Sequence, residues 1–188
     1  MIAFVRHGET PPNRAGLLLG RSDAALTEQG RAQAERLAKT LAGLGVERVL
    51  TSPLRRTRDT AAPIAAACDR SVEVDERLIE VDYGEWEGSP FGDLDADVVA
   101  RWRRDGSFAP PGGESLAVVA DRVASFCDEW LDERVVVAVS HVSPIKAAVT
   151  WTLRVPPELA WRMRLDVASI TRIGPAPVLL SFNETVRS

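Results

Sequence analysis

The chain contains only two histidines, and each is the second residue after a short apolar run. The segment Arg6-His7-Gly8-Glu9-Thr10 follows Ile2–Val5, and Ser140-His141 follows Val135–Val139. Near pH 7 a neutral imidazole has a nitrogen lone pair that can attack an electrophile or accept a proton. A single histidine in a globular protein is usually structural. Two histidines that both follow apolar runs of this kind indicate a site for nucleophilic or acid–base chemistry.

Two adjacent arginines lie close behind a third apolar run. Val46–Leu50 is followed by Thr51-Ser52-Pro53-Leu54-Arg55-Arg56. Ser52-Pro53 predicts the start of a helix, with serine as the cap and proline at the first helical position. Helix N-termini attract anions, and guanidinium groups bind phosphate oxygens through paired hydrogen bonds. Because arginines in a first turn oppose the helix dipole, an anion site explains them better than surface ion pairing does.

The elements that must position these residues alternate between two patterns. The three apolar runs lack polar alternation and are typical of strands covered on both faces. Helices are predicted from Thr27 to Leu44, from Glu114 to Trp130, and from Ser143-Pro144 onward. This alternation predicts an α/β fold, a three-layer sandwich with a largely parallel central sheet flanked by helices. Ligands of such sheets bind at the carboxyl ends of the strands, where the histidines and arginines fall.

The rest of the chain is less regular. Gly84–Gly113 is a long excursion with one predicted helix around Leu94–Arg103, in which Asp95 and Asp97 are expected to be solvated. Ala168–Ile173 is predicted to be a strand near the end of the chain. Because no repeat or interdomain linker is evident, we expect a single domain over residues 1–188.

Composition excludes several classes of protein. Of the 188 residues, 45% are hydrophobic and 27% are charged, which excludes a disordered, collagen-like or coiled-coil chain. The formal net charge is −4, so we expect no nucleic-acid partner. No run approaches the roughly 18 apolar residues of a membrane span, and Met1–Val5 is too short for a signal peptide. We therefore expect a cytoplasmic protein without a membrane partner, and a homodimer stays open.

The two cysteines do not predict a disulfide framework. Cys68 and Cys127 lie among apolar residues of predicted helices, where each is expected to be a small buried hydrophobe. With only two histidines, the sequence has no Cys/His spacing typical of a metal site. We expect neither a metal ion nor a cofactor.

Six segments, in order along the chain, resemble motifs of the histidine phosphatase superfamily, the phosphoglycerate-mutase-like proteins. Together they run nearly end to end, and six in order make coincidence negligible. The segments are Arg6–Thr10 with Asn13; Gly20–Asp23 with Leu26–Gly30; Ser52–Arg56 with Thr60-Ala61; Leu78–Glu80 with Tyr83–Gly88; Gly112–Ser115; and Ser140-His141.

The resemblance implies a role for each matching residue. His7 matches the nucleophile that becomes a phosphohistidine. Arg6 and Arg56 match the arginines that hold the phosphoryl oxygens, with His141 beside them. Glu80 matches the acid that protonates the leaving alcohol and then activates the hydrolytic water. The nearby alternatives, which the motif indicates to be solvated or loop-bonding carboxylates, are Asp82, Glu85 and Glu87. The family's fold and a small phosphorylated metabolite as substrate follow from the same resemblance. The expected substrate-binding residues are Asn13, Arg21, Glu9, Thr10, Glu114 and Val142.

One segment departs from the family's pattern. Many relatives have two glycines after the second histidine, whereas this chain has Val142 and Ser143. Val142 hinders close approach of the backbone to a phosphate, and Ser143 is expected to cap the following helix. Ser140–Lys146, together with Met163–Asp166 and Ala168-Ser169, is similar to α-ribazole phosphatase-like proteins. α-Ribazole phosphate is therefore one substrate that the resemblance suggests.

Three functional readings differ in class. The resemblance favours a phosphatase over a cofactor-dependent phosphoglycerate mutase, because the segment from Gly88 to Gly112 is short and covers the site less against water. A catalytically silent phosphate-binding or regulatory module is the third reading. It is disfavoured because the whole catalytic set is present. Four aromatic residues of the excursion either stack on a leaving group or pack in the core: Trp86, Phe91, Trp102 and Phe108. Sugar phosphates, phosphoglycerates and nucleotides stay open as substrates.

Overall fold

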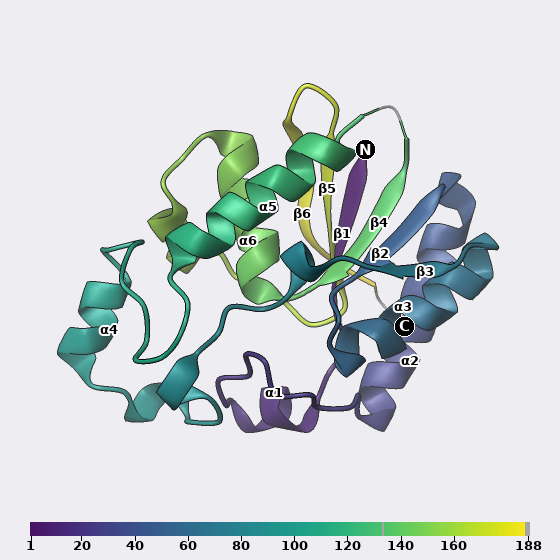
Figure 1. Cartoon of the computed structure of the whole chain (residues 1–188). Coiled ribbons are helices and arrows are strands. Elements are labelled where there is room, and N and C mark those ends of the chain that lie inside the picture. Colours follow the sequence, from purple (N-terminus) through teal and green to yellow (C-terminus); the bar gives the residue numbers. More distant parts are fainter. Residues whose placement is uncertain (133, 187–188) are drawn as a thin grey trace.

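The computed structural model, which describes residues 1–132 and 134–186, is built on a six-stranded mixed sheet (Figure 1). The strand order is β3-β2-β4-β1-β5-β6. The first four strands are parallel, and the last two run antiparallel to their neighbours. The predicted α/β sandwich is confirmed, with a sheet parallel over four of its strands. The strands are β1 (Ile2–Arg6), β2 (Arg48–Thr51), β3 (Val72–Val74), β4 (Val136–Ser140), β5 (Ser169–Gly174) and β6 (Val178–Thr185).

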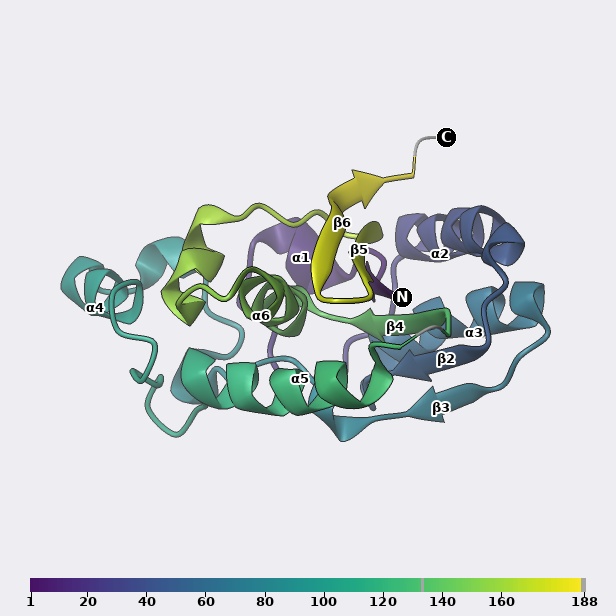
Figure 2. The same ribbon diagram turned by 90° about the horizontal axis from the view of Figure 1, so that it is seen from above.

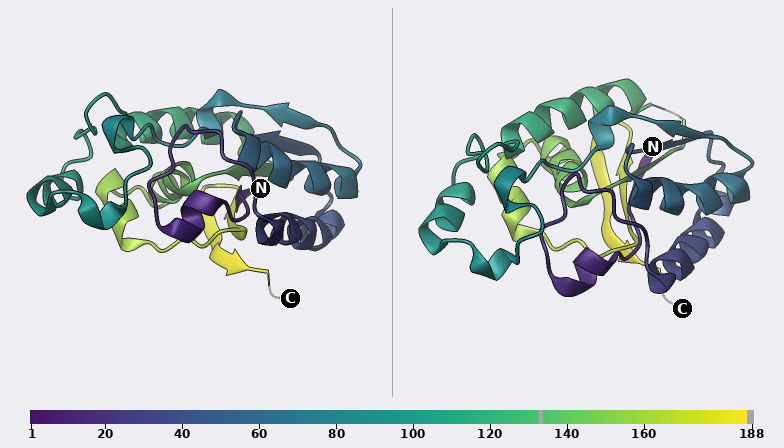
Figure 3. Two further views of the ribbon diagram at one scale, coloured as in Figure 1. Left: turned by 90° about the horizontal axis from the view of Figure 1, so that it is seen from below. Right: turned by 60° about the horizontal axis from the view of Figure 1, so that its bottom comes forward.

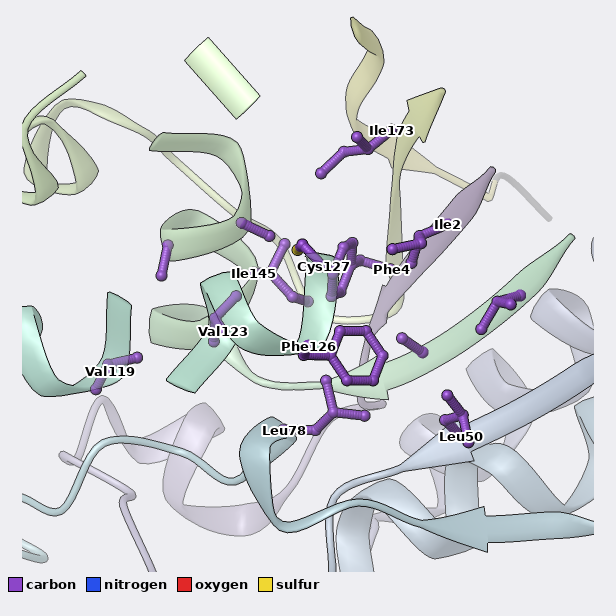
Figure 4. Close-up of a cluster of buried hydrophobic side chains, with 14 of the residues drawn as sticks. Ile2, Phe4, Leu50, Leu78, Val119, Val123, Phe126, Cys127, Ile145 and Ile173 are labelled. Carbon is purple, nitrogen blue, oxygen red and sulfur yellow. The ribbon is translucent and has the colours of Figure 1, made fainter. Parts of the chain in front are cut away.

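Helices cover both faces of this sheet (Figures 1 and 2). Successive side chains of a strand point to opposite faces, so β1 contributes to two cores. Ile2 and Phe4 pack with residues of α5 and α6, whereas Ala3 and Val5 pack with α2 and α3. Figure 4 shows the first core, in which the Phe4 and Phe126 rings lie 5.9 Å apart. The α-helices are α1 (Pro11–Ala15), α2 (Glu28–Leu41), α3 (Arg55–Cys68), α4 (Ala96–Trp102), α5 (Leu116–Trp130) and α6 (Val142–Leu153).

Two of the predicted helix starts are wrong by about two residues. Helix α3 begins at Arg55 after Leu54, which provides no side-chain cap, so Ser52-Pro53 lies in the preceding turn. Helix α6 begins at Val142, and Ser143 lies inside its first turn rather than capping it. Each serine has a partner in the site instead: Ser52 contacts His141, and the Ser143 N–H donates to Glu80. The prediction that Arg55 and Arg56 lie in a first turn is confirmed.

Other helix ends agree more closely with the sequence. Thr27 caps α2 as predicted, by accepting the N–H of Gly30. The predicted helix of the excursion is α4, which stands away from the sheet in Figure 1. Asp95 is not simply solvated, since its carboxylate caps α4 by accepting the N–H groups of Asp97 and Val98.

The carboxyl ends of β1, β2 and β4 lie beside α1. In Figure 3 this end of the sheet comes forward, with the purple helix α1 and the chain after it beside the strand ends. The sequence did not predict α1 or the three-residue strand β3. Cys127 is buried on α5 as predicted, and Cys68 is half-buried at the end of α3. None of the helices in the described part of the chain has the length and apolar character required to span a membrane.

Candidate active site

Three neighbouring strands bring the predicted catalytic residues to one edge of the sheet. Arg6 pairs with Ser140 in the register of β1 and β4, and Thr51 pairs with Val139 in that of β2 and β4. The residues after these pairs therefore start side by side. The rings of His7 and His141 lie 5.1 Å apart between centroids. The two histidines meet where the sequence predicted a site.

Backbone contact defines which nitrogen of His7 is free. The ring is almost fully buried, and its Nδ1 lies 2.7 Å from the carbonyl oxygen of Gly8. Because a carbonyl only accepts hydrogen bonds, Nδ1 carries the proton and Nε2 of the neutral ring has the lone pair. Burial, followed by the positive charges of Arg56 and Arg6, lowers the pKa of His7 well below its ordinary value. The ring is held in the neutral form that a nucleophile requires.

His141 has the opposite tautomer. Its Nδ1 accepts from Nε of Arg56 at 3.1 Å, and a guanidinium only donates. The ring proton therefore lies on Nε2, which donates to Oγ of Ser52 at 2.8 Å. Burial and then the charge of Arg56 lower the pKa of His141 well below its ordinary value. A neutral His141 thus sits beside Arg56 without charge repulsion.

Arg56 is fully buried, and the protein holds it through three donors. Besides its contact with His141, it donates from Nη2 to the carbonyl of Gly20 at 2.6 Å and from Nη1 to that of Ser22 at 2.8 Å. Burial lowers the pKa of Arg56. Arg55 is exposed and pairs with Asp59. Of the adjacent pair, Arg56 therefore lies beside His141, whereas Arg55 lies at the surface.

The loop that supplies these carbonyls is itself held by Glu87. Its carboxylate accepts the N–H groups of Gly20, Arg21 and Ser22, at distances between 2.9 and 3.3 Å. Glu87 therefore positions the loop that positions Arg56. The sequence indicated that Glu87 is solvated or bonded to a loop, but it did not predict which loop.

Arg6 has one buried N–H group that is not paired within the described ranges. Its Nη1 donates to the carbonyl of Leu165 at 2.6 Å, and its Nε is buried without a hydrogen-bond partner among residues 1–132 and 134–186. Burial lowers the pKa of Arg6. A buried guanidinium N–H without a partner costs free energy, which an anion bound at the site would recover.

Glu80 is held at the N-terminus of α6. Oε1 accepts the N–H of Val81 at 2.8 Å and of Ser143 at 3.1 Å, and Oε2 accepts that of Val142 at 3.0 Å. The first N–H groups of a helix have no intrahelical partner, so a carboxylate there satisfies them. The backbone N–H groups of Val142 and Ser143, which glycines at these positions would also supply, orient the predicted acid.

Asn13 is oriented by Thr10. Its Oδ1 accepts the N–H of Thr10 at 3.2 Å and the Thr10 hydroxyl at 2.8 Å. Because a backbone N–H only donates, the amide orientation is determined, and Nδ2 is the group left for another partner. Thr10 itself is fully buried and caps α1. Thr10 therefore positions the residue that offers a donor.

Three other predicted binding residues are engaged by neighbouring side chains. Glu9 accepts from Arg14 at 2.6 Å and from Thr27 at 2.8 Å, and these bonds lower the pKa of its carboxyl. The partners of the two remaining residues form one cluster. Glu114 takes a bidentate pair of hydrogen bonds from Arg122 at 3.0 and 3.1 Å, and Arg21 lies 3.5 Å from both Glu114 and Asp82.

Two glycines allow the loop after β1 to approach α2. A Cβ on Gly8 would lie 2.4 Å from the carbonyl oxygen of Gly30, and one on Gly30 would lie 2.2 Å from that of Glu9. Both distances are far shorter than real contacts, so any side chain would move the loop that carries His7. Both glycines occur in the motifs that the sequence singled out, but their contact was not predicted.

The aromatic residues of the excursion divide between two places. Trp102 is buried, and its ring centroid lies 4.6 Å from that of Trp161. Trp86 and Phe108 stack beside α4, where they line an open hollow of about 530 Å³. That hollow includes none of the predicted catalytic residues. Within the described ranges, no group of three or more His, Cys, Asp or Glu side chains is placed to hold a metal ion.

Comparison with known proteins gives a consistent family. The model of the histidine phosphatase superfamily (branch 1) matches residues 2–182. A probable phosphoglycerate mutase from Erwinia tasmaniensis is 37% identical over 180 residues, covering 92% of this chain and 83% of its own. Mycobacterial relatives are 36% identical over 177 residues, but the chain spans only about half of their length (49%).

Two solved structures are similar over nearly their whole length. Mycobacterial glucosyl-3-phosphoglycerate phosphatase, complexed with VO3, has a TM-score of 0.88 at 30% identity and covers 98% of this chain and 99% of its own. Phosphoserine phosphatase from Entamoeba histolytica, complexed with 3-phosphoglyceric acid, also has a TM-score of 0.88 at 30% identity, with 98% and 96% covered.

Proposed function

Because the chain belongs to the histidine phosphatase superfamily, we propose that it hydrolyses phosphomonoesters through a phosphohistidine intermediate. One observation carries the proposal. The buried His7 ring donates from Nδ1 to Gly8, so that its Nε2 lone pair is free near the half-buried Arg6 and the buried Arg56. A catalytically silent module would not need this arrangement. The set Arg6, His7, Arg56, Glu80 and His141 is also complete.

In the first half of the reaction, Nε2 of His7 attacks the phosphorus of the substrate. A P–N bond forms and the bond between phosphorus and the ester oxygen breaks, with Glu80 giving its proton to the leaving alcohol. Arg6 and Arg56 stabilise the charge on the phosphoryl oxygens, and Nδ2 of Asn13 is a further donor. These cations are the protein's own, so we propose that the reaction requires no divalent metal.

In the second half, water attacks the phosphohistidine. Glu80, now ionised, accepts a proton from the water as the new P–O bond forms and the P–N bond breaks. Inorganic phosphate leaves, with His7 and Glu80 restored. The three N–H groups that hold Glu80 fix the position of its carboxylate for both steps.

The proposed substrate is a small phosphorylated metabolite. Both similar solved structures are named as phosphatases of such compounds, which supports hydrolysis. One relative is named as a probable phosphoglycerate mutase, so transfer of the phosphoryl group to a second acceptor is the alternative reaction. α-Ribazole phosphate is one compound for a substrate panel, on the resemblance of Ser140–Lys146 alone.

Phosphate release from p-nitrophenyl phosphate in excess EDTA tests the proposal. We expect activity in the unaltered chain and a loss of at least about 1,000-fold in His7→Gln, since the nucleophile is absent. Protein quenched in alkaline detergent should contain alkali-stable, acid-labile phosphate only when His7 is present. Activity that survives His7→Gln would contradict the mechanism. Phosphate transfer to 3-phosphoglycerate with little release would instead favour the mutase.

The adjacent arginines offer a matched pair of variants for the same assay. Arg56→Lys keeps the charge but loses the planar fork, and we expect kcat/KM to fall between about 10-fold and 1,000-fold. Arg55→Lys changes an exposed residue one position earlier and should leave kcat/KM within about 2-fold. Equal losses in the two variants would contradict the assignment of Arg56.

A further inference from the structure

A small cavity lies beside the N-terminus of α6, whose first N–H groups hold Glu80. Its volume is about 60 Å³, and Val142 and Ser143, whose N–H groups hold Glu80, form part of its wall. The remaining wall includes Tyr83, Trp102 and Trp161, with Lys146. In the proposed reaction Glu80 protonates the leaving oxygen, so the alcohol part of the substrate must extend close to this wall.

Lys146 is a half-buried cation without a fixed partner. In the described part of the chain, its ammonium group makes no hydrogen bond and no ion pair within 4.0 Å, although its charge interacts with those of Glu80 and Arg6. It lies on α6 one turn after Val142 and Ser143, and helical side chains lean toward the N-terminus of their helix. Its stem therefore runs toward Glu80. Burial lowers the pKa of Lys146, so an anion nearby would stabilise its charged form.

The cavity wall has further hydrogen-bond donors besides the hydroxyls of Tyr83 and Ser143, which bond to each other. The indole N–H groups of Trp102 and Trp161 are buried and have no partner among residues 1–132 and 134–186. Trp102 is 2% exposed, and its ring packs against those of Trp161 and Tyr83, with centroids 4.6 and 6.0 Å away. An ammonium and two indole N–H groups around an aromatic space favour a small, acceptor-rich anion.

We propose that Lys146 binds a carboxylate on the alcohol part of the substrate, so that the enzyme prefers phosphomonoesters of hydroxy acids. This inference rests on the proposed function. A carboxylate carries one charge, as Lys146 does, and it fits a cavity of this size. A second phosphate group is bulkier and more highly charged, and proteins usually bind it with several cations or a guanidinium fork. Lys146 is thus a specificity-determining residue for the proposed reaction.

Two pairs of substrates that differ at the carboxylate test this. O-Phosphoserine is compared with O-phosphoethanolamine, and 3-phosphoglycerate with glycerol 3-phosphate. The ratio of kcat/KM within each pair should favour the carboxylate by about 10-fold to 100-fold, the value of one charged hydrogen bond. In Lys146→Met, which keeps an apolar stem of similar length, the ratio should fall to near 1. Lys146→Arg should retain most of it.

Each other outcome overturns the inference. If Lys146→Met lowers both members of a pair equally and moves the pH profile, then Lys146 acts on Glu80 and not on the substrate. If propane-1,3-diol bisphosphate is hydrolysed better than either carboxylate, the cavity takes a phosphate. Thermal unfolding of Lys146→Met shows whether the variant is folded. p-Nitrophenyl phosphate has no carboxylate, so His7-dependent activity on it tests the proposed function separately. If that activity is absent, both the proposed function and this inference lose their basis.

Discussion

At the scale of single residues, the two histidines carry their protons on opposite ring nitrogens because their partners differ. Gly8 offers His7 an acceptor at Nδ1, whereas Arg56 offers His141 a donor at Nδ1. Since the chain has only these two histidines, nitrogen NMR of the rings gives two separate sets of signals. We expect a neutral Nδ1–H ring and a neutral Nε2–H ring at pH 6, below the ordinary histidine pKa. Replacement of one histidine assigns them.

A sequence motif identifies residue types and their spacing, and this decides which features of the site could be predicted. The motifs named His7, Arg56 and Glu80, and the pattern of elements could place the first two, because His7 follows a strand and Arg56 lies in the first turn of a helix. Motifs do not record hydrogen-bond direction, so neither ring tautomer was predictable. The cavity at Lys146 was not predictable either, because Trp161 and Trp102 meet it from segments far apart in the chain.

At the scale of elements, the junction of the β1 loop with α2 depends on glycine. Gly30→Ala would place a Cβ 2.2 Å from the carbonyl oxygen of Glu9, and backbone atoms cannot yield easily. We expect a loss of about 1–3 kcal/mol in the free energy of unfolding, together with reduced kcat as the His7 loop shifts. Urea denaturation and the phosphatase assay measure the two effects.

Gly43→Ala is the matched control, since a Cβ there meets nothing within 4 Å. It should leave activity unchanged and alter the free energy of unfolding by less than about 1 kcal/mol. Similar losses in both variants would show that general helix effects, and not the contact with Glu9, account for the result.

The elements also show where sequence reasoning succeeds and fails. Short apolar runs without polar alternation predicted the buried strands, and apolar stripes predicted the helices over them, because burial requires such patterns. The strand β3 has only three residues, which is too few for a period to be evident. Helix starts at Ser52 and Ser143 were misplaced because both serines serve the site: local capping patterns compete with tertiary contacts that a sequence does not display.

At the scale of the whole molecule, the buried neutral histidines link stability to pH. In the unfolded chain both rings take up protons as the pH falls through about 6.5, whereas in the folded protein the pKa of each is well below that value. The unfolded state then binds more protons, so the free energy of unfolding falls. Each ring contributes a slope of up to about 1.4 kcal/mol per pH unit below pH 6.5.

Urea denaturation at pH 7.5, 6.5 and 5.5 measures this slope. In a His7→Asn, His141→Gln double variant the decrease between pH 7.5 and 5.5 should be smaller by the contribution of the two rings. The carboxyl groups titrate alike in both proteins, so they cancel in the comparison. Parallel pH dependence in the two proteins would contradict neutral, buried histidines.

The central position of β1 affects how the molecule is made. Its five residues form hydrogen bonds with β4 and β5, whose residues lie beyond position 135. During synthesis, Ile2–Val5 therefore stays unpaired until most of the chain has emerged, and the sheet can close only then. Folds dominated by such distant contacts fold slowly, and an exposed apolar strand in a growing chain is a site for aggregation. The strand that delivers the nucleophile is thus synthesised before its partners and can reach its final place only after β4 and β5 have been made.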